Sequence, residues 1–166
     1  MVITVSIDCF VFSLQKATQK NRPHCVKQET NMEDQGRSYI AFISYRHAEM
    51  DSAIAKALHT HIEQYRIPRG LRKDGKKRLG LVFRDEEELH AASDLTAEIQ
   101  LALENTEFLI VICSENSIQS PWVGREIAYF LQHHDRSKVL AVLASGEPNE
   151  VFPRQLTHMP DGQIIE

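Results

Sequence analysis

The residues best suited to chemistry lie in the segment SPWVGREIAYF, residues 120–130. Ser120 suits a helix N-cap and Pro121 the first helical position, so a helix is predicted to begin here. At about 100° per residue, Trp122 and Glu126 share a stripe beside the apolar face of this helix. A carboxylate close to a core needs a reason, because burying a charge is costly. Held in a sheltered cleft, it can stabilise positive charge that develops on a bound molecule.

Apolar runs and amphipathic segments alternate along the rest of the chain and must position this helix. Strands are predicted at 38–45, 79–83, 108–114 and 138–144, and helices at 50–65 and 93–107 and from Ser120 onward. This βαβαβαβ order predicts an α/β domain. The expected fold is a flavodoxin-like open parallel sheet of four to five strands with helices on both faces.

The first two helices have predicted starts and inward faces. Asp51 or Ser52 is the expected N-cap of the first helix, and Ser93 is a candidate cap of the second. The expected inward residues of the first helix are Ile54, Ala57, Leu58, Ile62 and Tyr65, and those of the second are Leu95, Ile99, Ala102 and Leu103.

Ligands of open parallel sheets bind at the carboxyl ends of the strands. Polar residues follow three of the predicted strands, and a fourth group lies in the helix described above. The candidate site residues are Ser44, Tyr45 and Arg46, then Asp85, then Ser114, and finally Trp122 and Glu126.

Composition excludes several classes of function. With a net charge of −4 and 42% hydrophobic residues, the chain has no global attraction to nucleic acid or anionic membranes. Three cysteines without a CxxC motif indicate a reducing, cytoplasmic location rather than disulfides or a zinc site. The histidines lack the spacing of a metal site, and no metal is expected. Motifs for dinucleotide, P-loop and zinc-protease sites are absent.

Three segments fall outside the regular pattern. Residues 1–36 are expected to form a flexible leader, residues 37–156 the folded domain, and residues 157–166 a tail of a parent protein that is longer. The N-terminal apolar stretch is too short to span a membrane and lacks the features of a signal peptide. In the loop 66–78, seven of thirteen residues are basic, which predicts an exposed loop or a hairpin turning at Asp74 and Gly75.

Four segments together resemble the Toll/interleukin-1 receptor (TIR) domain family, in its bacterial NAD-cleaving form. The resemblance covers about residues 38–145. AFISYRHAEMD is similar to the first-strand box and LVFRDEEEL to the second strand with the acidic start of the BB loop. FLIVICSENSIQSPW resembles the third strand and its exit loop, and WVGREI the Trp-x-x-x-Glu helix motif. The BB loop lacks the usual Gly or Pro-Gly, and the basic loop 66–78 is longer than is typical of the family.

The resemblance implies an activity. The Glu of the motif is the catalytic residue of NAD-cleaving TIR domains, which points to Glu126 and to cleavage of NAD⁺ between nicotinamide and ribose, without a further cofactor. One carboxylate can suffice, because nicotinamide leaves from a positively charged ring and needs no general acid. The product would be ADP-ribose or a cyclic isomer. The remaining candidates are expected to line the pocket, with Arg46 either contacting phosphate or ribose or forming a structural ion pair.

The family also implies self-association, in which the BB loop of one copy completes the pocket of the next, and a role in bacterial defence or signalling. The alternative is a non-catalytic module that binds other TIR domains to pass a signal. In that case Glu126 would merely pair with a base such as Arg125 or Arg136.

Overall fold

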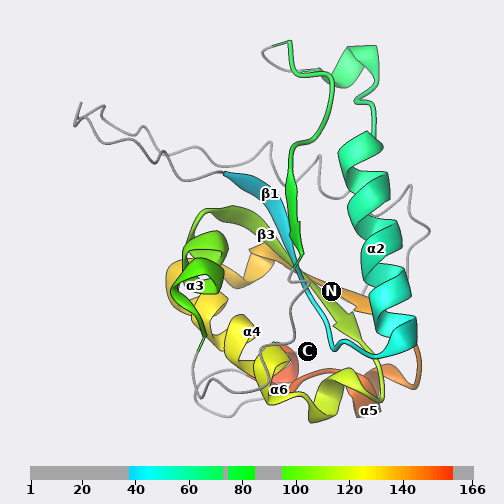
Figure 1. Cartoon of the computed structure of the whole chain (residues 1–166), viewed down its shortest axis with the longest axis vertical. Helices are drawn as coiled ribbons and strands as arrows, with labels where there is room; N and C mark the ends of the chain where they lie inside the picture. Colours follow the sequence, from blue (N-terminus) through cyan, green and yellow to red (C-terminus); the bar gives the residue numbers. More distant parts are fainter. Residues whose placement is uncertain (1–37, 73–74, 85–94, 159–166) are drawn as a thin grey trace.

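Four parallel strands form the central sheet of the computed structural model, which describes residues 38–72, 75–84 and 95–158 (Figure 1). The strands are β1 (Tyr39–Ser44), β2 (Val82–Arg84), β3 (Thr106–Cys113) and β4 (Val139–Leu143). Their order across the sheet is β2-β1-β3-β4, and every neighbouring pair is parallel. The predicted α/β fold with an open parallel sheet is therefore confirmed.

Helices cover both faces of this sheet, as Figure 1 shows. Helix α2 (Glu49–Gln64) lies on one face, and α3 (Ala97–Glu104) and α4 (Pro121–His133) lie on the other. Successive strand residues point to opposite faces, so β3 contributes to both cores. Phe108, Ile110 and Ile112 pack on the α2 side, whereas Leu109, Val111 and Cys113 pack on the side of α3 and α4. A strand buried on both faces explains the unbroken apolar run of the sequence.

Helix α2 begins earlier than predicted and presents a different face. Its N-cap is Ala48, so the expected N-cap at Asp51 or Ser52 is wrong. The buried residues are Asp51, Ala55, Leu58 and Ile62, and Ala57, expected inside, is exposed. The inward face is thus rotated toward Asp51. Because an aspartate near a helix start commonly caps it, the sequence predicts Asp51 at the cap rather than in the core.

As predicted, Leu95, just before α3, and the α3 residues Ile99, Ala102 and Leu103 are buried. The expected cap Ser93 lies outside the described residues. Thr96 occupies the N-cap position, where its hydroxyl accepts a hydrogen bond from the Ile99 amide at 3.3 Å.

The basic loop is an antiparallel pairing rather than an open coil. Arg66 and Arg78 form an antiparallel bridge, and the Ile67 amide donates to the Lys77 carbonyl at 2.9 Å. Gly75 has a φ of 72°, a left-handed conformation that glycine adopts without strain. These contacts support the hairpin interpretation of the sequence, although Asp74 lies outside the described residues.

Short helices complete the described chain: η1 (Arg69–Leu71), η2 (Ser117–Gln119), η3 (Arg136–Lys138), α5 (Pro148–Val151) and α6 (Arg154–Thr157). The expected domain end at residue 156 falls inside α6. In the described ranges, none of the helices has both the length and the apolarity that a membrane crossing requires.

Candidate functional site

The centre of the candidate site is a buried contact between Ser44 and Glu126. The Ser44 hydroxyl donates a hydrogen bond to Glu126 Oε2 at 2.5 Å, although the two residues are 82 positions apart in sequence. Ser44 is 1% exposed and Glu126 6%. Ser44 is the last residue of β1, so the carboxylate lies at the carboxyl end of a central strand. The expected position of Glu126, beside the core and near the strand ends, is confirmed.

Helix α4 carries Glu126 to this place through its apolar face. Val123, Ile127 and Phe130 are fully buried against the sheet, and Glu126 adjoins them on the same side. Pro121 is the first helical residue, as predicted. Ser120 occupies the N-cap position, but the described structure shows no capping hydrogen bond from its side chain.

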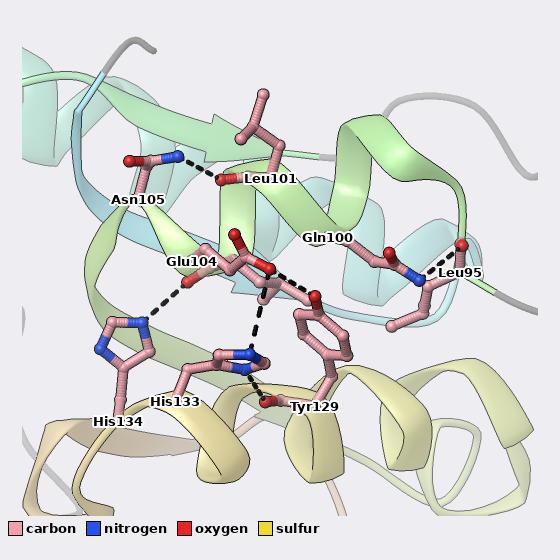
Figure 2. Close-up of polar contacts among 9 residues, drawn as sticks. Leu95, Gln100, Leu101, Glu104, Asn105, Tyr129, His133 and His134 are labelled. Atoms are coloured by element: carbon pink, nitrogen blue, oxygen red, sulfur yellow. Dashed lines mark hydrogen bonds and ion pairs between the residues drawn. The ribbon is translucent and has the colours of Figure 1, made fainter.

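Helix α4 is also fastened to α3 by polar contacts between their C-terminal halves (Figure 2). The Tyr129 hydroxyl donates to Glu104 Oε1 at 2.5 Å, and this hydrogen bond raises the pKa of Tyr129. His134 Nε2 lies 3.0 Å from the Leu103 carbonyl, and its ring stacks on Phe130. These contacts hold the part of α4 that follows Glu126 against α3.

Two arginines are the predicted alternative partners of Glu126, and the structure shows further contacts for both. Arg125 lies over the Trp122 ring, with its guanidinium carbon 5.1 Å from the ring centroid. Arg136 donates to three carbonyl groups of the C-terminal segment, those of Gln155, Leu156 and His158. Pairing of Glu126 with either arginine stays a prediction.

Tyr45 and Arg46 follow Ser44 and point in different directions. Tyr45 is buried, and its hydroxyl accepts a hydrogen bond from Arg84 Nη1 at 3.3 Å. Arg46 is exposed, and its Nη1 donates to the Asn116 carbonyl at 3.0 Å. Asn116 belongs to the loop after β3, so this bond ties the ends of two neighbouring strands together. Substrate contact by either residue stays a prediction.

Ser114 has a different environment from the pocket rim that the sequence led us to expect. It is fully buried, and its hydroxyl donates to Asp51 Oδ2 at 2.7 Å. The same hydroxyl accepts a hydrogen bond from the Ser117 amide at 3.0 Å. Its polar atoms are therefore committed to the protein, and a direct contact with substrate stays a prediction.

Asp51 is the residue that sequence reasoning missed. It is 0% exposed in the first turn of α2. Its position four residues before Ala55, in phase with Leu58 and Ile62, was the available signal. Burial above all, together with the charge of Asp51, raises the pKa of Cys113 to about 12, so this thiol stays protonated and is no nucleophile at neutral pH.

The remaining candidates are only partly placed. Trp122, in the first turn of α4, is half-buried and packs against the hydrophobic core on the α3 and α4 side of the sheet. Asp85 lies outside the described residues. Within the ranges that the structure describes, no three His, Cys, Asp or Glu side chains are grouped as a metal site would require.

A separate open pocket of about 660 Å³ lies between α4 and the segment containing α5 and α6. Gly124, Arg125 and Ala128 line it from α4, and Phe152 and Gln155 line it from the other side. Ser44 and Glu126 are not among its lining residues. This pocket is therefore distinct from the surroundings of the buried carboxylate.

Comparison with known proteins places the chain in a family. The chain is 38% identical over 109 residues to "NAD(+) hydrolase ApTIR" of Actinoplanes sp. (strain ATCC 31044 / CBS 674.73 / SE50/110). The match covers 66% of this chain and 14% of that protein, so the chain spans a small part of its relative. A solved structure, the TIR domains of the activated Roq1 resistosome directly recognizing the pathogen effector XopQ, is 22% identical with a TM-score of 0.49. That match covers 68% of this chain and 61% of the other. The family model for the TIR domain matches residues 41–161, well over half of the sequence, and the chain therefore belongs to the TIR domain family.

Proposed function

We propose that this domain is an NAD⁺ nucleosidase that cleaves the bond between nicotinamide and ribose. The observation that carries the proposal is the carboxylate of Glu126, 6% exposed and held by Ser44 at the end of a central strand. The named activity of the 38%-identical relative supports the same reaction. Keeping this charge out of water costs free energy, which favours a role that requires it.

In the proposed reaction, the bond between ribose C1′ and the nicotinamide nitrogen breaks, and the electron pair leaves with nicotinamide. The ring nitrogen is thereby neutralised, so no general acid is needed. Positive charge develops on the ribose as an oxocarbenium-like species, and the Glu126 carboxylate stabilises it. Water then attacks C1′ and loses a proton to give ADP-ribose, or a nucleophile of the same molecule attacks to give a cyclic isomer. The proposed reaction uses no metal or further cofactor.

Neighbouring residues have roles in binding. Ser44 orients the carboxylate through its hydrogen bond, and Trp122, one helical turn before Glu126, shields it from water. Arg46, exposed two residues after Ser44, suits a phosphate or ribose of the substrate. Tyr45, Ser114 and Asp85 complete the proposed set of pocket residues.

We propose further that activity requires self-association of TIR domains and serves bacterial signalling or defence. The resemblance to NAD-cleaving TIR domains, which implies that the BB loop of one copy completes the pocket of the next, supports assembly as the means of activation. This predicts an isolated domain that is nearly silent in dilute solution and active when clustered.

The test is NAD⁺ cleavage by the purified chain, clustered on beads and compared with the same protein in dilute solution. Glu126→Gln keeps the shape of the side chain and removes its charge, and it should lower the rate about 10²–10³-fold. Glu98→Gln, an exposed carboxylate in the first turn of α3, is the matched control and should cleave at the wild-type rate.

Two results would decide against the proposal. If clustered wild type leaves NAD⁺ intact while TIR domains still bind one another, the chain is an interaction module. If Glu126→Gln cleaves as fast as wild type, Glu126 is not the catalytic residue.

A further inference from the structure

We infer that Asp51 is a positioning residue of the site, which orders the loop after β3 and through it Arg46. This assignment goes beyond the carboxylate of Glu126 and rests on the proposed function for its kinetic test. Asp51 comes from α2, on the opposite face of the sheet from α4. Helix α4 thus places the buried carboxylate of Glu126 at the carboxyl end of β1. Helix α2 places the buried carboxylate of Asp51 at the carboxyl end of the adjacent strand β3.

The first step is the link from Asp51 to the loop. Ser114, directly after β3, donates its hydroxyl proton to Asp51 Oδ2 at 2.7 Å. This leaves the oxygen of Ser114 free to accept the Ser117 amide at 3.0 Å. In return, the Ser117 hydroxyl lies 2.7 Å from the Ser114 amide, from which it accepts, and it donates to the Ser114 carbonyl at 3.0 Å. Asp51 therefore sets the direction of a closed set of hydrogen bonds that shapes residues 114–117.

The second step is the link from the loop to the site. Asn116 lies within this shaped segment, and its carbonyl accepts the hydrogen bond from Arg46 Nη1 at 3.0 Å. The same segment continues through η2 into α4. When the loop loses its shape, Arg46 loses its anchor, whereas Glu126 keeps its bond to Ser44 and its place on α4. The effect of Asp51 should therefore fall on substrate binding more than on the chemical step.

The third step is the cost of Asp51 to folding. The residue is 0% exposed, and among the described residues its Oδ1 atom has no hydrogen-bond partner. The amide groups at the start of α2 compensate such a charge only in part. A buried carboxylate with one satisfied oxygen is a poor choice for stability alone, since apolar residues of similar size commonly serve as well or better. We therefore attribute the carboxylate of Asp51 to its role in ordering residues 114–117.

The experiment measures kcat and KM for NAD⁺ on clustered protein. Asp51→Ala should raise KM about tenfold, the factor expected from the loss of one buried hydrogen bond, with kcat within about twofold of wild type. Asp51→Asn should recover most of the affinity, because its amide oxygen still accepts from Ser114. Arg46→Ala should raise KM similarly, and the double variant Arg46→Ala/Asp51→Ala should be little worse than either single variant. Glu49→Ala, exposed in the same turn of α2, is the control and should change neither constant.

A fall in kcat at unchanged KM would overturn the inference, because it indicates fewer folded molecules rather than a misplaced Arg46. Additive effects of Arg46→Ala and Asp51→Ala on KM would overturn it as well.

Hydrogen exchange tests the same inference if wild type shows no cleavage and the proposed function fails. Asp51→Ala should then speed exchange of the Ser114 and Ser117 amides about tenfold and leave β4 unchanged. Unchanged exchange in residues 114–117, or equal acceleration in β4, would refute the positioning role.

Discussion

The hydrogen bond between Ser44 and Glu126 is the contact on which the candidate site depends, and a double-mutant cycle can measure it without any assay of activity. Ser44→Ala leaves the Glu126 carboxylate without this donor, and Glu126→Ala leaves the Ser44 hydroxyl without this acceptor. In the double variant neither group is left behind. The cycle therefore isolates the interaction between the two side chains.

The structure sets the expected magnitude. The two residues are 1% and 6% exposed, so water replaces the missing partner poorly. The bond is 2.5 Å long and its acceptor is a carboxylate. Hydrogen bonds to charged groups contribute about 1.5–3 kcal/mol. We expect Ser44→Ala to lower the free energy of unfolding by about that amount, and the coupling energy between Ser44 and Glu126 to be of the same size.

Urea unfolding at pH 7 is the assay. Far-UV circular dichroism reports the helices, and the single tryptophan, Trp122, reports the site one helical turn from Glu126. With a slope of about 1–3 kcal/mol per molar urea, the midpoint should shift by roughly 1 M, which is easily resolved. Coincident transitions from the two probes would justify a two-state treatment.

A control cycle shows whether the method discriminates. Thr60→Ala on α2 and Glu98→Ala on α3 lie on opposite faces of the sheet, and their effects should add within about 0.5 kcal/mol. If Ser44 and Glu126 show a coupling no larger than this control, the two side chains do not form the bond, and the placement of the carboxylate at the end of β1 is refuted.

Two further predictions concern the surroundings of the site. Gly146 has a φ of 79°, and a Cβ there would lie 2.5 Å from Val151 Cγ1, so Gly146→Ala should lower stability by more than about 1 kcal/mol. Gly70→Ala, with nothing within 4 Å of its Cβ, should leave the melting temperature nearly unchanged, and equal shifts for both would contradict the strain at Gly146. Burial and the charge of Asp51 raise the pKa of Cys113 from 9.0 to about 12, so its contribution to stability is complete below pH 9 and is lost as the pH rises toward 12. With Cys9 and Cys25 replaced by Ser, the folded protein should therefore resist thiol reagents at pH 9 and react on unfolding, and rapid labelling of the folded form would disprove the burial of this thiol.

Local patterns in the sequence determined the elements and their order. The apolar run that became β3, the Pro121 start of α4 and the inward face of α3 are all set by residues close together in the chain, where the periods of strands and helices can be read directly. The helical stripe that holds Glu126 is also determined locally, because a helix fixes the direction of each side chain relative to its neighbours. The family motif around Trp122 and Glu126 added a chemical interpretation to that geometry.

Tertiary structure alone decided which polar groups meet. Ser44 and Glu126 are 82 positions apart in sequence, and Ser114 and Asp51 are 63 positions apart. No periodicity of the sequence encodes such pairs. Asp51 shows the limit most clearly, since a capping role and a buried role are both compatible with an aspartate near the start of a helix. Only the packing of α2 on the sheet selects between them, because the apolar neighbours Ala55, Leu58 and Ile62 turn Asp51 inward when they are buried together. Hydrophobic burial is the larger free-energy term and sets the rotation of the helix, and the polar partners are then determined by what that rotation brings into reach.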